Sequence, residues 1–164
     1  MSNWNSFTKK IAIKTPIDEV YQAWSTQKGI ESWFLRCAIY TSTDGKKKAP
    51  NELIEAGDTY LWHWHGYPDT VNESHKITAV NNKDKIQFGF TGNCLVTVTL
   101  SSLKDQTIVS LKQENIPDDD NPKTNLLVGC GEGWTFYLAN LKSILEGGID
   151  LRNKDEEISD VINS

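Results

Sequence analysis

Long apolar runs are missing from this sequence. Nowhere among its 164 residues do about 18 apolar residues follow one another, which is the length that a membrane-spanning helix requires. The segment 1–14 also lacks the basic start and apolar stretch that are typical of a secretory signal. We therefore expect a cytoplasmic protein with no membrane span.

Cysteine and basic residues are both scarce. The cysteines Cys37, Cys94 and Cys130 form no C-x-x-C pair, so neither a zinc ribbon nor a thioredoxin-type site is indicated, and buried free thiols are expected. Lys and Arg number 17 against 22 Asp and Glu, which gives a formal net charge of -5. This balance disfavours a nucleic-acid partner, because phosphate binding requires a basic surface. The basic run 46–48 is interpreted as a solvated loop.

Motifs of the common catalytic classes are absent as well. There is no G-x-S-x-G elbow, and the glycines at 129, 131 and 133 do not follow the G-x-G-x-x-G spacing of a phosphate loop. The acidic run 118–120 lacks the ligand spacing and distal Glu of an EF-hand loop. The sequence therefore predicts no catalytic residue and no cofactor, and it leaves enzymatic activity open.

The sequence does contain a series of short alternating segments. Phe7, Ile11 and Ile13 alternate with polar residues, which predicts a first strand. Two short helical segments follow, one over 16–24 and one that holds Trp33. Because the later connections are mostly short and polar, successive strands should pair as antiparallel hairpins. The further strands are predicted at 35–41, 59–65, 71–80, 85–91, 94–103 and 107–114.

One long amphipathic helix is predicted over 124–146. Its apolar stripe repeats every three or four residues, and it is the longest element available to cover the sheet. The stripe consists of Leu127, Cys130, Trp134, Leu138, Leu141 and Leu145. The predicted fold is α+β of the helix-grip type, a curved antiparallel β-sheet with two short helices wrapped around a long C-terminal α-helix. Residues 1–148 form this domain, and the charged tail 149–164 either docks through Leu151, Ile158 and Val161 or frays.

Three segments carry a resemblance to a known family. They are PIDEVYQAW at 16–24, GIESWF at 29–34 and GEGWTFYLANLKSILEGG at 131–148. Together they resemble the START/Bet v 1-like (SRPBCC) superfamily, and the last is similar to the C-terminal helix of the branch related to the activator of Hsp90 ATPase. The resemblance implies a cavity between sheet and helix. It covers only the second domain of the eukaryotic activators, so it does not imply chaperone activation.

Aromatic side chains supply the candidate ligand site. Tyr60, Trp62 and Trp64 share one face of a predicted strand, and large flat side chains can line a pocket for an apolar molecule. The helix should present its own rings across from them. The predicted ligand-binding residues are Trp33, Tyr60, Trp62, Trp64, Phe88, Phe90, Val96, Val98, Trp134, Tyr137, Leu138 and Leu141.

Histidines offer an alternative site. His63 and His65 point to one side of their strand, and a symmetric turn at 66–70 would place Glu73 and His75 on the same face. Such a set could hold zinc, although a one-residue slip in register would separate it. Because that face lies opposite the aromatic one, we predict solvated histidines and no bound metal.

Three hypotheses about function follow from these observations. The first is binding of an apolar or amphipathic small molecule in the cavity. The second is a protein-interaction module with a protein partner, as the chaperone-linked branch implies. The third, by analogy with cyclase relatives, is an enzyme acting on a hydrophobic ligand. A titratable group deep in the pocket would favour the enzyme, and an exposed apolar patch would favour the protein partner.

Overall fold

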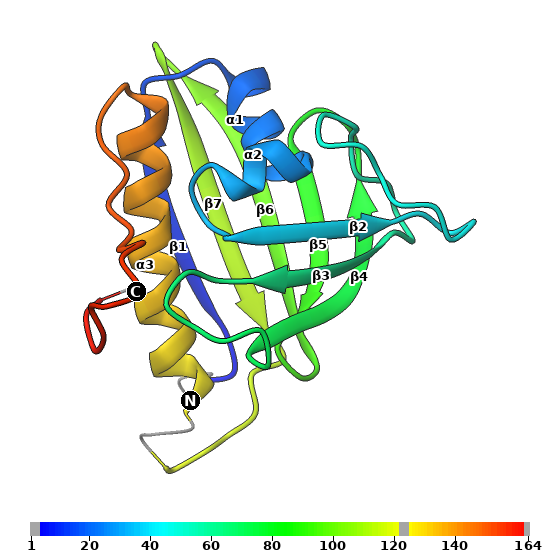
Figure 1. Cartoon of the computed structure of the whole chain (residues 1–164). Coiled ribbons are helices and arrows are strands. Elements are labelled where there is room, and N and C mark those ends of the chain that lie inside the picture. The colour runs from blue at the N-terminus through cyan, green and yellow to red at the C-terminus, as the bar shows by residue number, and fades with distance from the viewer. Residues whose placement is uncertain (1–3, 122–124, 163–164) are drawn as a thin grey trace.

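A computed structural model of the chain describes residues 4–121 and 125–162. Seven antiparallel strands form one sheet in the order β1-β7-β6-β5-β4-β3-β2, and three helices accompany it (Figure 1). The strands are β1 (Phe7–Ile13), β2 (Cys37–Thr41), β3 (Thr59–His63), β4 (Asn72–Val80), β5 (Lys85–Phe90), β6 (Cys94–Leu103) and β7 (Gln106–Glu114), and the helices are α1 (Ile17–Ser25), α2 (Gln27–Glu31) and α3 (Leu126–Leu145).

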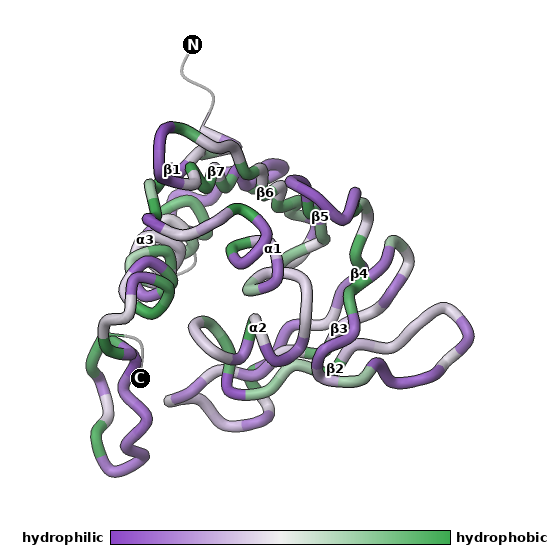
Figure 2. Tube along the Cα trace, turned by 90° about the horizontal axis from the view of Figure 1, so that it is seen from above, coloured by the Kyte–Doolittle hydropathy of each residue, from purple (hydrophilic) through white to green (hydrophobic). Residues whose placement is uncertain are grey.

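This architecture confirms the predicted α+β helix-grip fold. Seen from above, the strands follow an arc from β1 to β2, α3 lies across its open side, and α1 and α2 lie inside it (Figure 2). Buried and less buried residues alternate along β5, β6 and β7, so one face of the sheet is the buried one. Within the described part of the chain, no helix combines the length and apolarity that a bilayer crossing would need.

The element boundaries differ from the prediction at two helices. The second helix ends at Glu31, so Trp33 and Phe34 follow it in a turn and are buried beneath it. The long helix begins at Leu126, where the Asn125 side chain accepts hydrogen bonds from the backbone N–H groups of Leu127 and Val128. The predicted start at 124 lies outside the described residues.

Aromatic rings fill the part of the core under α1 and α2. The rings of Trp24 and Trp33 lie 4.6 Å apart between centroids, and the Trp33 indole Nε1 donates to the Ala23 carbonyl over 2.9 Å. Phe34 stacks on Trp134 of α3 at 5.0 Å. Edge-to-face and offset pairs of this kind stabilise a core beyond simple burial. The aromatic cluster therefore joins the short helices to the middle of α3.

The strand β4 changes partner along its length. Its first half pairs with β3 and its second half with β5, and the register shifts between Ile77 and Ala79. The end of β5 near Phe90 therefore has no backbone partner on β4, and two side-chain hydrogen bonds bridge this opening between the strands. Tyr60 donates its hydroxyl to the Gly89 carbonyl, and the Glu73 carboxylate accepts from the Thr91 N–H. The opening lies at the same end of β5 as Phe90.

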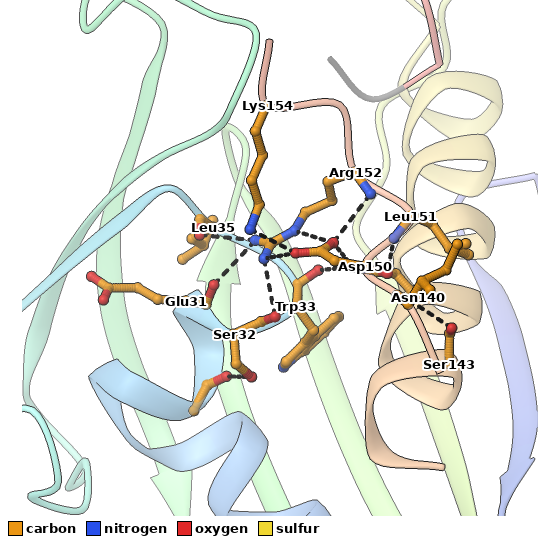
Figure 3. A network of polar contacts seen from close by, with 12 residues as sticks. Glu31, Ser32, Trp33, Leu35, Asn140, Ser143, Asp150, Leu151, Arg152 and Lys154 are labelled. Carbon is orange, nitrogen blue, oxygen red and sulfur yellow. Dashed lines mark hydrogen bonds and ion pairs between the residues drawn. The ribbon is translucent and has the colours of Figure 1, made fainter. Parts of the chain in front are cut away.

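The described part of the tail docks through polar residues. The expected anchors Leu151, Ile158 and Val161 remain 41%, 48% and 44% exposed. Instead, the guanidinium of Arg152, whose side chain is 3% exposed, reaches the end of α2 (Figure 3). It donates to three backbone carbonyls there and pairs with the Asp150 carboxylate. The three carbonyls belong to Glu31, Ser32 and Leu35.

Candidate ligand-binding cavity

An open cavity of about 600 Å³ lies beside the first half of α3. Its walls come from α3, from the connection between β3 and β4, from the turn after α2 and from the end of the described tail. The lining residues are Phe34, Trp64, Tyr67, Val71, Phe90, Asn125, Leu126, Gly129, Cys130, Glu132, Gly133, Trp134, Tyr137 and Ile162. The surface is mostly apolar, and its volume falls in the range of small-molecule sites.

Glycine makes room for this cavity. Gly129 and Gly133 are four residues apart and therefore lie on one face of α3. A Cβ atom added at either position would meet no heavy atom within 4 Å outside its own neighbourhood. Each glycine costs a helix interior ~1 kcal/mol relative to alanine. The two positions that bear this cost border the cavity.

Three of the polar groups in the lining, on Trp134, Tyr137 and Cys130, are uncharged or point away from the cavity. The Trp134 indole donates to the side-chain oxygen of buried Gln113 over 2.9 Å, so its polar edge faces the sheet. Burial, reinforced by nearby Tyr67, raises the pKa of Tyr137. Burial also raises the pKa of the Cys130 thiol. These groups present hydroxyl and thiol, and not anions, at neutral pH.

The predicted ligand-binding residues divide into two groups. Trp64, Phe90, Trp134 and Tyr137 line the cavity. The other eight belong to the closed core and do not border the cavity. They are Trp33, Tyr60, Trp62, Phe88, Val96, Val98, Leu138 and Leu141.

Several lining residues were not among those predicted. Phe34 was recognised only as part of a helical segment, and Tyr67 and Val71 were assigned to a turn and a strand. Ile162 belongs to the tail and reaches the cavity only because the tail folds back. The glycines of α3 are a signal in the sequence that could have pointed to the cavity, since each is costly inside a helix and needs a compensating reason.

The histidine set is divided between the two faces of the sheet. In the β3–β4 pair, Trp62 lies opposite Glu73 and Tyr60 lies opposite His75. Glu73 and His75 therefore share the face of the aromatic residues, and the symmetric-turn arrangement with His63 and His65 is wrong by one residue of register. Among residues 4–121 and 125–162, no group of three or more His, Cys, Asp and Glu side chains could hold a metal ion together.

A second, polar cleft of about 660 Å³ borders the first cavity at Tyr67. It lies between the β3–β4 connection and the tail. Arg36 pairs there with Asp69, and Lys154 pairs with Asp150 over 2.8 Å. Burial, together with the nearby positive charges of Arg152 and Lys154, lowers the pKa of His65. The cleft thus contains paired charges and a neutral imidazole.

Residues 14–146 match the model of the activator of Hsp90 ATPase homolog 1-like protein family. The chain belongs to this family. The match spans strands β2 to β7 and helices α1, α2 and α3, and only β1 lies before it among the strands of the sheet; this confirms the resemblance seen in the sequence. A comparison with curated protein sequences gives no match.

Solved structures of similar fold cover most of the chain. SSP2350 from Staphylococcus saprophyticus is 22% identical, with a TM-score of 0.67 over 90% of this chain and 96% of that one. The Aha1 dimer from Colwellia psychrerythraea is 18% identical, with a TM-score of 0.67 over 87% and 97%. DynU16, from the dynemicin biosynthetic locus, is 16% identical, with a TM-score of 0.66 over 87% of this chain and 48% of its own. At these identities the likeness shows the family's fold alone.

Proposed function

We propose that this family member binds an apolar or amphipathic small molecule in the cavity beside α3. The observation that carries the proposal is the aromatic and glycine-bordered lining of a space of about 600 Å³. An open, mostly apolar pocket of this size with aromatic walls is typical of small-molecule sites, and apolar surface gathered in one place commonly marks a binding site. The cavity is open at one side, which gives a ligand a path of entry.

The chemistry of the lining supports binding more than catalysis. The Cys130 thiol and the Tyr137 hydroxyl both have a raised pKa, which is the opposite of what an activated nucleophile needs. Glu132 is exposed at the rim, and no described residue forms an ion pair with it that would orient it as a general base. We therefore assign the cavity to recognition and not to a reaction.

The first experiment is a titration with the neutral apolar dye Nile red. Burying about 200 Å² of ligand apolar surface supplies about 5 kcal/mol before the costs of association, so saturable one-to-one binding with a Kd no tighter than about 0.2 mM is expected from this term alone. Trp64 and Trp134 line the cavity, so part of the tryptophan emission should be quenched.

A substitution that fills the cavity provides the decisive test. Gly129→Leu adds a side chain where an added Cβ meets open space, and it should abolish dye binding while the fold persists. Val128→Leu changes the neighbouring exposed residue, which does not line the cavity, and should bind like the wild type. Equal binding by both variants, with circular dichroism unchanged, would refute the proposal.

A protein partner at the cavity rim is the second candidate function. Tyr67 and Val71 are 50% and 45% exposed, and Ile162 is 77% exposed. Apolar side chains gathered around one opening are typical of an interaction surface. Sedimentation velocity across a concentration series distinguishes this case, since self-association that Tyr67→Ser together with Val71→Ser removes would favour it over a free ligand mouth.

A further inference from the structure

The rim of the cavity carries a single kind of charge. Glu132 is the one charged side chain among the described residues that line the cavity. It is exposed on α3 and forms no ion pair with another described residue. An unpaired carboxylate at a ligand mouth attracts cations and repels anions.

The cationic side chains in and beside the neighbouring polar cleft already form ion pairs or hydrogen bonds. Arg36 and Lys154 of the neighbouring cleft pair with Asp69 and Asp150. The Arg152 guanidinium is almost fully buried, and its hydrogen bonds go to Asp150 and to backbone carbonyls. The lowered pKa of His65 keeps that imidazole neutral at neutral pH. Lys9 of β1 lies beside Gly131 and outside the lining, so the described residues that line the cavity offer an anion no positive partner.

The walls add to this preference. Rings make up much of the lining, and the face of an aromatic ring carries negative potential that attracts a cation within about 6 Å. Hydroxyl groups on Tyr67 and Tyr137 can serve a neutral polar head as well. The six rings are Phe34, Trp64, Tyr67, Phe90, Trp134 and Tyr137.

From this geometry, and resting on the proposed ligand cavity, we propose that the site selects neutral and cationic aromatic amphiphiles over anionic ones. Glu132 is the residue that sets the preference. Flat ring systems fit between the aromatic walls, and a polar head remains at the mouth beside the carboxylate.

A matched ligand series tests the proposal. Naphthylmethylamine, naphthalenemethanol and naphthylacetate carry the same ring with a cationic, a neutral and an anionic head. Each is titrated at neutral pH and low salt, with tryptophan fluorescence as the readout. A pair of exposed charges changes affinity by about two- to five-fold, so the amine should bind better than the alcohol, and the acetate worse, by about that factor. Added salt should shrink both differences.

The variant Glu132→Gln identifies the source of the preference. It should bring the three affinities together while the affinity for the alcohol stays unchanged. Glu19→Gln removes the same charge from an exposed position on α1, outside the cavity, and should keep the wild-type order. The acetate binding as tightly as the amine, or a gap that survives Glu132→Gln, would overturn the charge preference. Failure of the neutral alcohol to bind at all would instead reject the cavity as a ligand site.

Discussion

The two halves of α3 differ in burial and in what they contact. In the first half, up to Gly133, only Gly131 is buried, and Gly129 and Gly133 leave part of the cavity side of the helix without side chains. In the second half, Trp134, Tyr137, Leu138, Asn140 and Leu141 are all buried. The first half therefore walls a cavity, while the second half belongs to the core. A continuous apolar stripe in the sequence thus serves packing at one end and recognition at the other.

The second half has an additional anchor that the first half lacks. The buried Asn140 side chain donates to the Trp33 carbonyl over 2.7 Å and accepts from the Leu151 N–H over 2.7 Å. It thereby joins α3 to both the turn after α2 and the tail (Figure 3). Buried polar groups that are fully paired fix a unique arrangement.

The largest effect should come from the core half. Leu141→Ala removes a fully buried side chain and should lower the free energy of unfolding by about 4 kcal/mol. Leu126→Ala, at the cavity and only partly buried, should cost less than about 1 kcal/mol. Urea denaturation of both variants measures the difference, and equal losses would contradict the division of α3 into two halves.

Removing the tail anchor should have the next largest effect. Arg152→Ala removes the guanidinium from the partly buried Asp150 carboxylate, which keeps Lys154 and Asn140 as partners, and strips three carbonyls of a donor, so the loss in stability should be about 3 kcal/mol. Arg152→Lys keeps the charge but cannot reach all of these acceptors, so it should recover part of the loss. Trypsin cleavage near Lys154 should accelerate in the alanine variant, and unchanged stability would contradict tail docking.

Acid should weaken the same anchor. Burial opposes ionisation of Asp150, but hydrogen bonds from Arg152 and Lys154 outweigh it and hold the pKa of that carboxyl well below its usual range. Because the folded pKa is depressed, this stabilisation is present above about pH 4 and is lost as pH falls further. The slope from one such group is at most about 1.4 kcal/mol per pH unit. Asp150→Asn should flatten the stability curve below pH 4, as measured by denaturation at each pH.

The smallest effects should come from the glycines of the cavity half. Replacing Gly129 or Gly133 with alanine should raise stability by about 0.5–1 kcal/mol, because the methyl group meets open space and the helix gains propensity. Both substitutions should also weaken dye binding, since both positions line the cavity. Gly131→Ala, outside the lining, should stabilise without changing affinity.

Periodicity predicted much of this fold. The alternation in β5 to β7 and the stripe of α3 predicted an antiparallel sheet of successive strands and its helical cover, but not the pairing of β1 with β7. The sequence could not tell which rings close the core and which leave space. Trp62 and Trp64 share a pattern, yet Trp62 packs against Phe88 at 5.2 Å while Trp64 lies past the end of β3 and borders the cavity. Whether a ring closes the core or borders a cavity depends on contacts between segments that are distant in the chain.

The register between β3 and β4 and the role of the Arg152 charge could not be predicted, for related reasons. The Trp62–Glu73 pairing depends on the conformation of a long connection, and a difference of one residue reverses the faces. Arg152 looked like one more charge in a solvated tail. Its acceptors are backbone carbonyls at the end of α2, about 120 positions earlier in the sequence. Because every residue has such a carbonyl, the sequence does not indicate which ones accept a hydrogen bond.

The pairing of β1 with β7 has a consequence for how the chain is made. Thr15, just after β1, donates its hydroxyl to the Leu145 carbonyl at the end of α3, 130 positions away. Contacts of such long range slow folding, because most of the chain must be ordered before they form. During synthesis on a ribosome, the hairpins from β3 to β7 can pair as they emerge, but the first strand has to wait with its apolar side uncovered. We therefore expect β1 to be the segment that depends most on chaperones while the protein is being translated.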